Sequence, residues 1–80
     1  MEKLMIDNGV NFFITTSSYN VDIDIAEYLG LSFKEYQNIL INNNAYRAIN
    51  GECYFQNRID AENTIKKLEP YLIMSILTNS

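Results

Sequence analysis

The sequence predicts a single α+β domain of 80 residues, in which a helix-turn-helix is followed by a β-hairpin and a third helix. Three observations lead to this fold class. Two helix starts lie close together around Gly30, the dipeptide Asn50-Gly51 separates two strand-like segments, and apolar residues recur at helical spacing beyond residue 57. With 48% hydrophobic residues the chain has enough apolar material for one core, so residues 1–80 are expected to form one domain.

The first elements are a strand at about residues 11–16 and a helix at about 23–29. The strand segment is dense in β-branched and aromatic residues, which favour extended structure. Asp24 and Glu27 have the spacing of a capping box, with an acceptor at the N-cap and a carboxylate three residues later. Gly30 then predicts the end of the helix, because glycine adopts the left-handed C-cap conformation most readily.

A second capping box, Ser32 with Glu35, predicts a helix that starts two residues after Gly30. Its apolar residues fall on one face, and it is expected to end in the run of asparagines at 42–44. These residues are Phe33, Tyr36, Ile39 and Leu40. Two capped helices joined by a glycine turn are the anatomy of a helix-turn-helix.

The segment from Tyr46 to Phe55 predicts a hairpin, because Asn50-Gly51 suits a two-residue type I′ turn. This turn would pair Arg47 with Tyr54 and Tyr46 with Phe55. Strand alternation would then place four residues on one core-facing side. They are Tyr46, Ala48, Cys53 and Phe55.

The third helix is expected to start near Asn57 and to end or kink at Pro70, which disfavours helical geometry in the residue before it. Residues 72–77 leave two alternatives. We favour a strand paired with residues 11–16, so that the N- and C-terminal strands complete a sheet, because residues 11–16 otherwise have no partner except the hairpin. A kinked continuation of the helix is the other alternative.

Composition excludes several function classes. Ten acidic against six basic residues give a net charge of −4, the wrong sign for a protein that mainly holds phosphate backbone. The chain has no histidine and only Cys53 as a thiol, and neither a metal-binding nor a nucleophilic constellation stands out, so we expect no enzyme, metal or cofactor. The longest apolar run is too short for a membrane span, and we expect a cytoplasmic protein.

The segment from Asp24 to Leu68 resembles the winged-helix domains of phage excisionases and MerR-type regulators. The motif residues are Ile25-Ala26-Glu27-Tyr28-Leu29-Gly30, Ser32 to Leu40, the hairpin Tyr46 to Phe55 as the wing, and the closing helix Asn57 to Leu68. The resemblance implies a DNA-binding regulator or excisionase-like protein as one candidate function. In that alternative the DNA contacts would come from Lys34, Gln37, Asn38, Asn42 and Arg47.

The charges depart from the family pattern. Residues 20–56 contain five acidic side chains but only Lys34 and Arg47 as bases, and Glu52 follows the wing turn. We therefore favour a small acidic inhibitor or adaptor that is encoded by a phage or mobile element and imitates nucleic acid to a basic groove on a host or mobile-element protein. Such an inhibitor would be analogous in type to anti-CRISPR and other anti-defence proteins. The expected partner-binding residues are Asp22, Asp24, Glu27, Tyr28, Glu52 and Tyr54, and a homodimer is left open.

Overall fold

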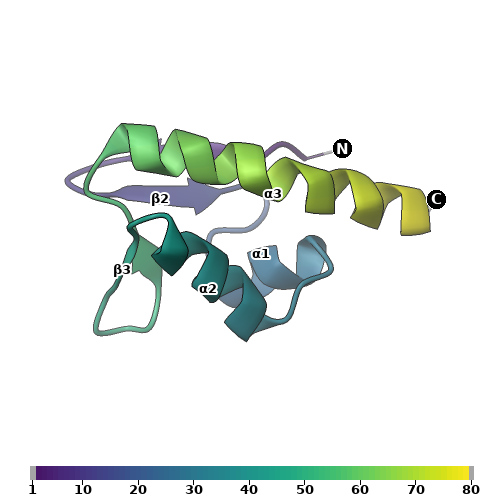
Figure 1. Ribbon diagram of the computed structural model, residues 1–80, viewed down its shortest axis with the longest axis horizontal. Helices are drawn as coiled ribbons and strands as arrows, with labels where there is room; N and C mark the ends of the chain where they lie inside the picture. The colour runs from purple at the N-terminus through teal and green to yellow at the C-terminus, as the bar shows by residue number, and fades with distance from the viewer. Residues whose placement is uncertain (1, 80) are drawn as a thin grey trace.

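The computed structural model describes residues 2–79, and in this range the chain has an α+β fold of three helices and two antiparallel hairpins (Figure 1). In chain order the elements are β1 (Met5–Asn8), β2 (Phe12–Thr15), α1 (Asp22–Tyr28), α2 (Phe33–Asn42), β3 (Tyr46–Arg47), β4 (Cys53–Tyr54) and α3 (Arg58–Asn79). The predicted fold class and the order helix, helix, hairpin, helix are therefore confirmed.

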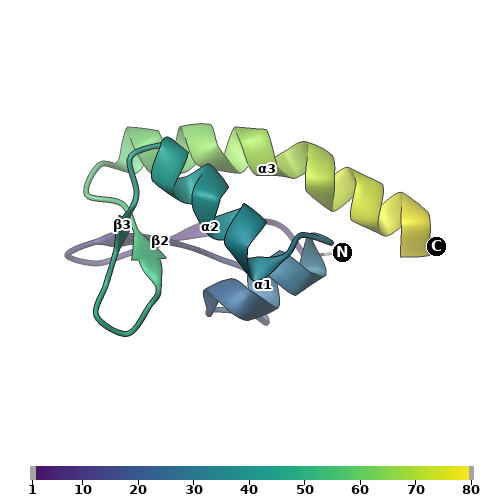
Figure 2. The same cartoon turned by 60° about the horizontal axis from the view of Figure 1, so that its bottom comes forward.

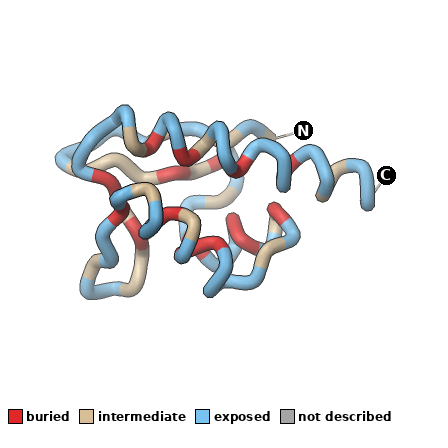
Figure 3. Tube along the Cα trace, in the orientation of Figure 1, coloured by how far each residue is buried: buried red, intermediate tan, exposed pale blue. Residues whose placement is uncertain are grey.

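The core lies between α3, β2 and the α1–α2 pair. In the view of Figure 1, α3 is drawn above β2 and the two shorter helices below it, with the β3–β4 hairpin at one end, whereas in the view of Figure 2 α2 is drawn between α3 and β2. The buried positions of α3 lie on the side toward β2 (Figure 3). Large side chains that are fully buried come from each layer and include Ile25, Tyr36, Leu40, Phe55 and Leu68.

The N-terminal hairpin contains a strand, β1, that the sequence did not indicate. It pairs antiparallel with β2, with Ile6 opposite Ile14. On its other edge β2 meets the segment after β4, because the backbone amides of Phe12 and Phe55 each donate to the other's carbonyl at 2.9 and 2.8 Å. β2 thus lies between β1 and the wing. The segment Met5-Ile6-Asp7-Asn8 was missed because half of it consists of residues that are depleted in strands.

The predicted strand at residues 72–77, and with it the pairing of N- and C-terminal strands, is wrong. α3 continues from Arg58 to Asn79 through Pro70. The buried residues Ala61, Thr64, Leu68 and Leu72 keep helical spacing across the proline, so packing on β2 favours helix throughout. Pro70 is exposed and lacks only one backbone donor, and α3 curves along its length in Figure 2.

The end of α1 is as predicted, but its start is not. Gly30 has φ +74°, with its N–H donating to Glu27 O at 3.0 Å and that of Leu31 to Ala26 O at 2.9 Å, the hydrogen bonds of a Schellman motif. The N-cap, however, is Val21, whose side chain makes no capping hydrogen bond. The Asp24–Glu27 capping box is therefore wrong, because the N-cap lies three residues earlier than that box requires.

The capping box of α2 is confirmed in both directions. Ser32 Oγ accepts from the Glu35 amide at 3.1 Å, and Glu35 Oε1 accepts from the Ser32 amide at 3.2 Å. The helix ends in a second Schellman motif, in which Asn44 takes the left-handed position with φ +76° and Ala45 N–H donates to Leu40 O at 3.0 Å. Both ends of α2 are thus specified by residues next to it in sequence.

The wing register differs by one residue from the prediction, since Tyr46 pairs with Tyr54 and Arg47 with Cys53. The Ala48 amide donates to Glu52 O at 2.8 Å, which closes a three-residue loop. Gly51 has φ +89°, whereas among the described non-glycine residues only Asn44 has a positive φ, so Asn50 cannot form a type I′ turn. The shift leaves Tyr46 51% exposed instead of in the core, while Cys53 and Phe55 are buried as expected.

None of the helices within the described residues combines the length and the apolar character that crossing a membrane requires.

Candidate binding surfaces

Asp22 lies inside a polar cluster that connects α1, α2 and the wing. Its side chain is only 4% exposed. Its Oδ2 accepts two hydrogen bonds of 2.8 Å, one from the Cys53 backbone N–H and one from Gln37 Nε2. We call the cluster of Asp22, Gln37, Arg47 and Glu52 the wing joint. The prediction that Asp22 is an exposed partner contact is wrong, because its carboxylate satisfies donors of the wing and of α2.

Gln37 is the centre of the wing joint. Besides its bond to Asp22, its Nε2 donates to Gly51 O at 2.7 Å, and its Oε1 accepts from Arg47 Nε at 3.2 Å. Both amide hydrogens and the amide oxygen are therefore in use, and the residue is 3% exposed. The predicted outward orientation of Gln37, needed to read adenine edges, is wrong. A clue was its position between Tyr36 and Leu40 on the buried side of α2.

Glu52 supplies the cap that α1 lacks in its own sequence. Its Oε1 accepts from the Asp22 backbone N–H at 2.8 Å, at the positive end of the helix dipole. The wing therefore folds back onto the start of α1, as the expected patch requires. The Glu52 side chain is nevertheless half-buried and engaged in the joint, so it is a structural residue first.

Two buried groups next to the joint are shifted in pKa. Burial, with a smaller contribution from the Asp22 carboxylate, raises the pKa of the Cys53 thiol from 9.0 to about 12. Burial and then Asp22 raise the pKa of Tyr36 further above its ordinary value. The Tyr36 hydroxyl has no hydrogen-bond partner among the described residues. Cys53 is thus held as an inert thiol, since the thiolate is the reactive form.

Tyr28 ties together distant parts of the chain. Its hydroxyl accepts from the Glu2 amide at 3.2 Å, its ring lies 5.5 Å from that of Tyr19, and its carbonyl accepts from Ser75 Oγ at 2.9 Å. The side chain is half-buried. These contacts join α1 to the N-terminus and to α3, so the ring is mainly structural.

Tyr54 lies on a separate surface. As expected, it points away from the core that buries Cys53, and it is half-exposed. Its ring packs between those of Phe13 and Tyr46, with centroids 6.2 and 5.8 Å away. The hollow beside it is lined by Phe13 and Arg47 together with residues of the wing loop. The expected single patch of acids and tyrosines therefore divides, and Tyr54 has a cation as its neighbour.

The two remaining predicted acids and one further carboxylate are exposed on the two short helices. Asp24 and Glu27 are exposed on α1, and Glu35 is exposed in the first turn of α2, where its hydrogen bond with the Ser32 hydroxyl lowers its pKa. Large apolar side chains accompany them: Ile23 is 58% exposed one turn before Glu27, and Phe33 is 41% exposed. We call these five residues the acidic helix face.

The residues of the DNA-binding alternative are only partly brought together. Lys34, Asn38, Asn42 and Arg47 are exposed. Lys34 and Arg47 line one hollow between α2 and the wing, together with Phe33 and Gly51. This hollow is the place where a phosphate could meet two cations.

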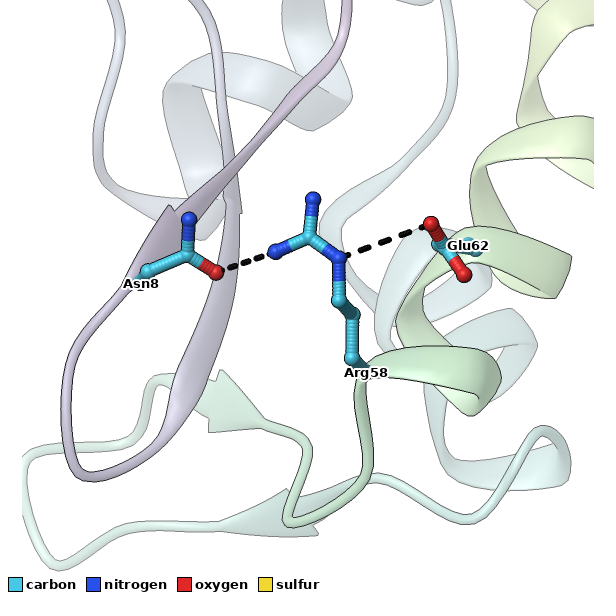
Figure 4. Close-up of polar contacts among 3 residues, drawn as sticks. All are labelled: Asn8, Arg58 and Glu62. Atoms are coloured by element: carbon cyan, nitrogen blue, oxygen red, sulfur yellow. Dashed lines mark hydrogen bonds and ion pairs between the residues drawn. The ribbon is translucent and has the colours of Figure 1, made fainter.

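Arg58 is engaged elsewhere. Its Nη1 donates to Asn8 Oδ1, and its Nε lies 3.5 Å from Glu62 Oε2 (Figure 4). These contacts link the first turn of α3 to β1. Both members of the ion pair are half-exposed, so the pair contributes little to stability.

Comparisons of the chain with protein-family models, with curated proteins and with solved structures found no match.

Proposed function

We propose that this protein is a small, acidic, non-catalytic inhibitor or adaptor that binds a partner protein through the acidic helix face. The observation that carries the proposal is the inward position of Gln37. In the place where the winged-helix resemblance implies a DNA-reading side chain, both hydrogen-bonding ends of Gln37 are used to lock the wing. The surface of the same helix pair that remains open carries carboxylates and apolar side chains instead.

The acidic helix face has the composition of a protein-binding surface. Interfaces place apolar, often aromatic, side chains at the centre and polar groups at the rim. Phe33 and Ile23 provide exposed apolar surface, and Asp24, Glu27 and Glu35 are exposed carboxylates on the same two helices, although Phe33 also borders the hollow of Lys34 and Arg47. Carboxylates and exposed apolar side chains on one helix pair suit a basic groove, because the negative charge speeds encounter and the apolar contacts slow dissociation.

The charge pattern favours a partner whose groove normally holds nucleic acid. With a net charge of −4, the protein repels phosphate backbone and attracts the cationic surfaces that bind it. Occupation of such a surface on a host or mobile-element protein, as anti-CRISPR and other anti-defence proteins do, would block its nucleic acid by competition. The proposal stands on this charge pattern and on the open acidic helix face.

The test is capture of partners from host lysate by the tagged protein, followed by mass spectrometry. We expect a basic nucleic-acid-binding protein that is lost when Asp24→Lys and Glu27→Lys are combined. The matched control is Asp7→Lys with Glu62→Lys, which changes the net charge equally at exposed positions on β1 and α3. Binding that weakens with salt and survives only in the control supports the proposal. Equal loss in both double variants would mean that net charge, and not this face, determines binding.

DNA binding is the second candidate, and the hollow that Lys34 shares with Arg47 favours it. Two cations would hold a nucleic acid only weakly, because affinity grows with the number of phosphate contacts and this hollow offers two. A gel shift with random duplex at about 50 mM salt separates the candidates. We expect no retardation. Retardation that disappears in Lys34→Ala with Arg47→Ala would contradict the inhibitor proposal and establish the hollow as a nucleic-acid site.

A further inference from the structure

The C-terminal part of α3 exposes large apolar side chains on more than one side of the helix. Leu72 is buried against the body and Ile76 is half-buried, but Tyr71, Ile73 and Met74 on the other sides are 41%, 57% and 62% exposed. The sequence contains no charged residue after Glu69. Exposed apolar side chains that form a continuous patch are normally covered by a partner, and here only one side of the helix is covered.

This part of α3 also projects beyond the rest of the protein. Both Figure 1 and Figure 2 show the C-terminal turns extending past the end of the α1–α2 pair. Figure 3 shows this part of the helix as mostly exposed, interrupted by a buried and a half-buried stretch. Another helix can therefore approach it without meeting the strands or the wing.

A groove lies along the same part of α3. Its apolar lining comes from Leu4 near the N-terminus and from Ile65, Leu72, Ile73 and Ile76 of the helix. Lys3 and Glu69 are the charged residues at its edge, one of each sign. Ile73 belongs both to the wall of the groove and to the exposed apolar surface, so one continuous surface carries a projection and a recess.

We propose that a second copy of this chain covers this surface. The two α3 segments would pack antiparallel across a two-fold axis, with Ile73 of each copy entering the groove of the other. A two-fold interface requires one self-complementary patch, and a projection beside a recess of the same apolar character provides it.

The charge distribution favours contact between two copies at this surface over contact at any other part of the protein. Two molecules that each carry −4 repel one another, but the segment after Glu69 is uncharged and the groove edge is neutral overall. The resulting dimer would present two acidic helix faces, which goes beyond the proposed function and makes the protein bivalent toward its partner.

Sedimentation velocity at protein concentrations up to several hundred micromolar tests the dimer. High concentrations are needed because one helix pair buries less than the roughly 800 Å² per partner of a standard interface, and the dimer should therefore be weak. We expect the wild-type chain to dimerise with rising concentration and Ile73→Glu to stay monomeric. The matched control is Ile59→Glu, which replaces another exposed isoleucine (69%) almost four turns earlier in α3, about 20 Å away. It should dimerise like the wild type. A monomeric wild type, or equal loss of the dimer in both variants, overturns the proposal.

Cross-linking gives a second readout that does not depend on a destabilising charge. Cys53 is the only cysteine and is 2% exposed, so Ile73→Cys and Ile59→Cys each add one reactive thiol. A short bis-maleimide should link Ile73→Cys into a dimer and leave Ile59→Cys monomeric. If neither variant is linked, while the wild-type chain binds lipid vesicles or only a different protein, the segment serves that other occupant and the proposal is wrong.

Discussion

Removal of the Asp22 carboxylate should destabilise the fold far more than removal of the carboxylate two residues later. Asp22 and Asp24 both lie in the first turn of α1. Asp22 is buried and accepts hydrogen bonds from Cys53 and Gln37, whereas Asp24 is exposed. The pair is thus a matched test of the wing joint, with the same residue type in the same helical turn.

The magnitude follows from the donors that Asp22→Ala leaves behind. The Cys53 backbone N–H and one amide hydrogen of Gln37 would lose their acceptor in an interior that water reaches poorly. Each hydrogen bond to a charged acceptor contributes about 1.5–3 kcal/mol. We therefore expect Asp22→Ala to lower the free energy of unfolding by about 3–5 kcal/mol, a large part of the 5–15 kcal/mol typical of a domain. Asp24→Ala should change it by about 0.5 kcal/mol or less.

Urea unfolding followed by circular dichroism measures both variants, with equal m-values showing that the unfolded states are comparable. Asp22→Asn is a further control, because its amide oxygen still accepts hydrogen bonds, and we expect a loss of about 1–2 kcal/mol. A loss for Asp22→Ala no larger than that for Asp24→Ala would falsify the reasoning, since it would mean that the joint contributes nothing to stability.

Three further predictions concern single positions. Gly30→Val should destabilise the fold by about 1–2 kcal/mol, because φ is +74° and nothing lies near the added side chain to offset the strain. Gly9→Ala is the control, since its added Cβ meets only an ordinary van der Waals contact and should be tolerated. Thermal melting compares the two variants. Tyr36→Phe should leave the melting temperature unchanged or raise it, because it removes a buried hydroxyl that lacks a partner among the described residues; a clear drop would indicate a hydrogen bond to water. Cys53 should resist alkylation in the folded protein at pH 8. Because its pKa is raised from 9.0 to about 12 on folding, its contribution to stability should be full below pH 9 and fall as pH rises toward 12; in alkaline denaturation the Cys53→Ala variant should lose the part of the fall that starts near pH 9 and keep the part due to Tyr36, whose pKa is also raised.

The end of α1 and both ends of α2 could be predicted from sequence because the groups that form them lie within a few residues of each other. Ser32 and Glu35 satisfy one another's amides, and Gly30 closes α1 with bonds to the turn just before it. The wing turn was located for the same reason, since Gly51 takes a positive φ there. Its register was missed because Asn50 is compatible with more than one turn type and only the backbone geometry selects among them.

The candidate site was predicted less well because exposure depends on distant partners. Asp22 and Glu52 were read as surface acids, but the partner of the Asp22 carboxylate is a backbone amide 31 residues away. The sequence is equally compatible with Gln37 pointing outward as a DNA contact and with Gln37 pointing inward as a buried amide. Asp24 and Glu27, which have no such partner among the described residues, stay on the surface as the sequence suggested.

The amino-acid sequence alone determined the α+β class, the helix-turn-helix with its glycine turn, the wing position and the acidic charge, since local hydrogen bonds and composition specify these. Tertiary structure decided the helical state of residues 72–77, the partner of β2 and the burial of Asp22 and Gln37. The physical reason is the same in each case. An apolar segment or a polar side chain has several acceptable local states, and the one adopted is the one whose burial and hydrogen bonds are completed by residues far away in the chain.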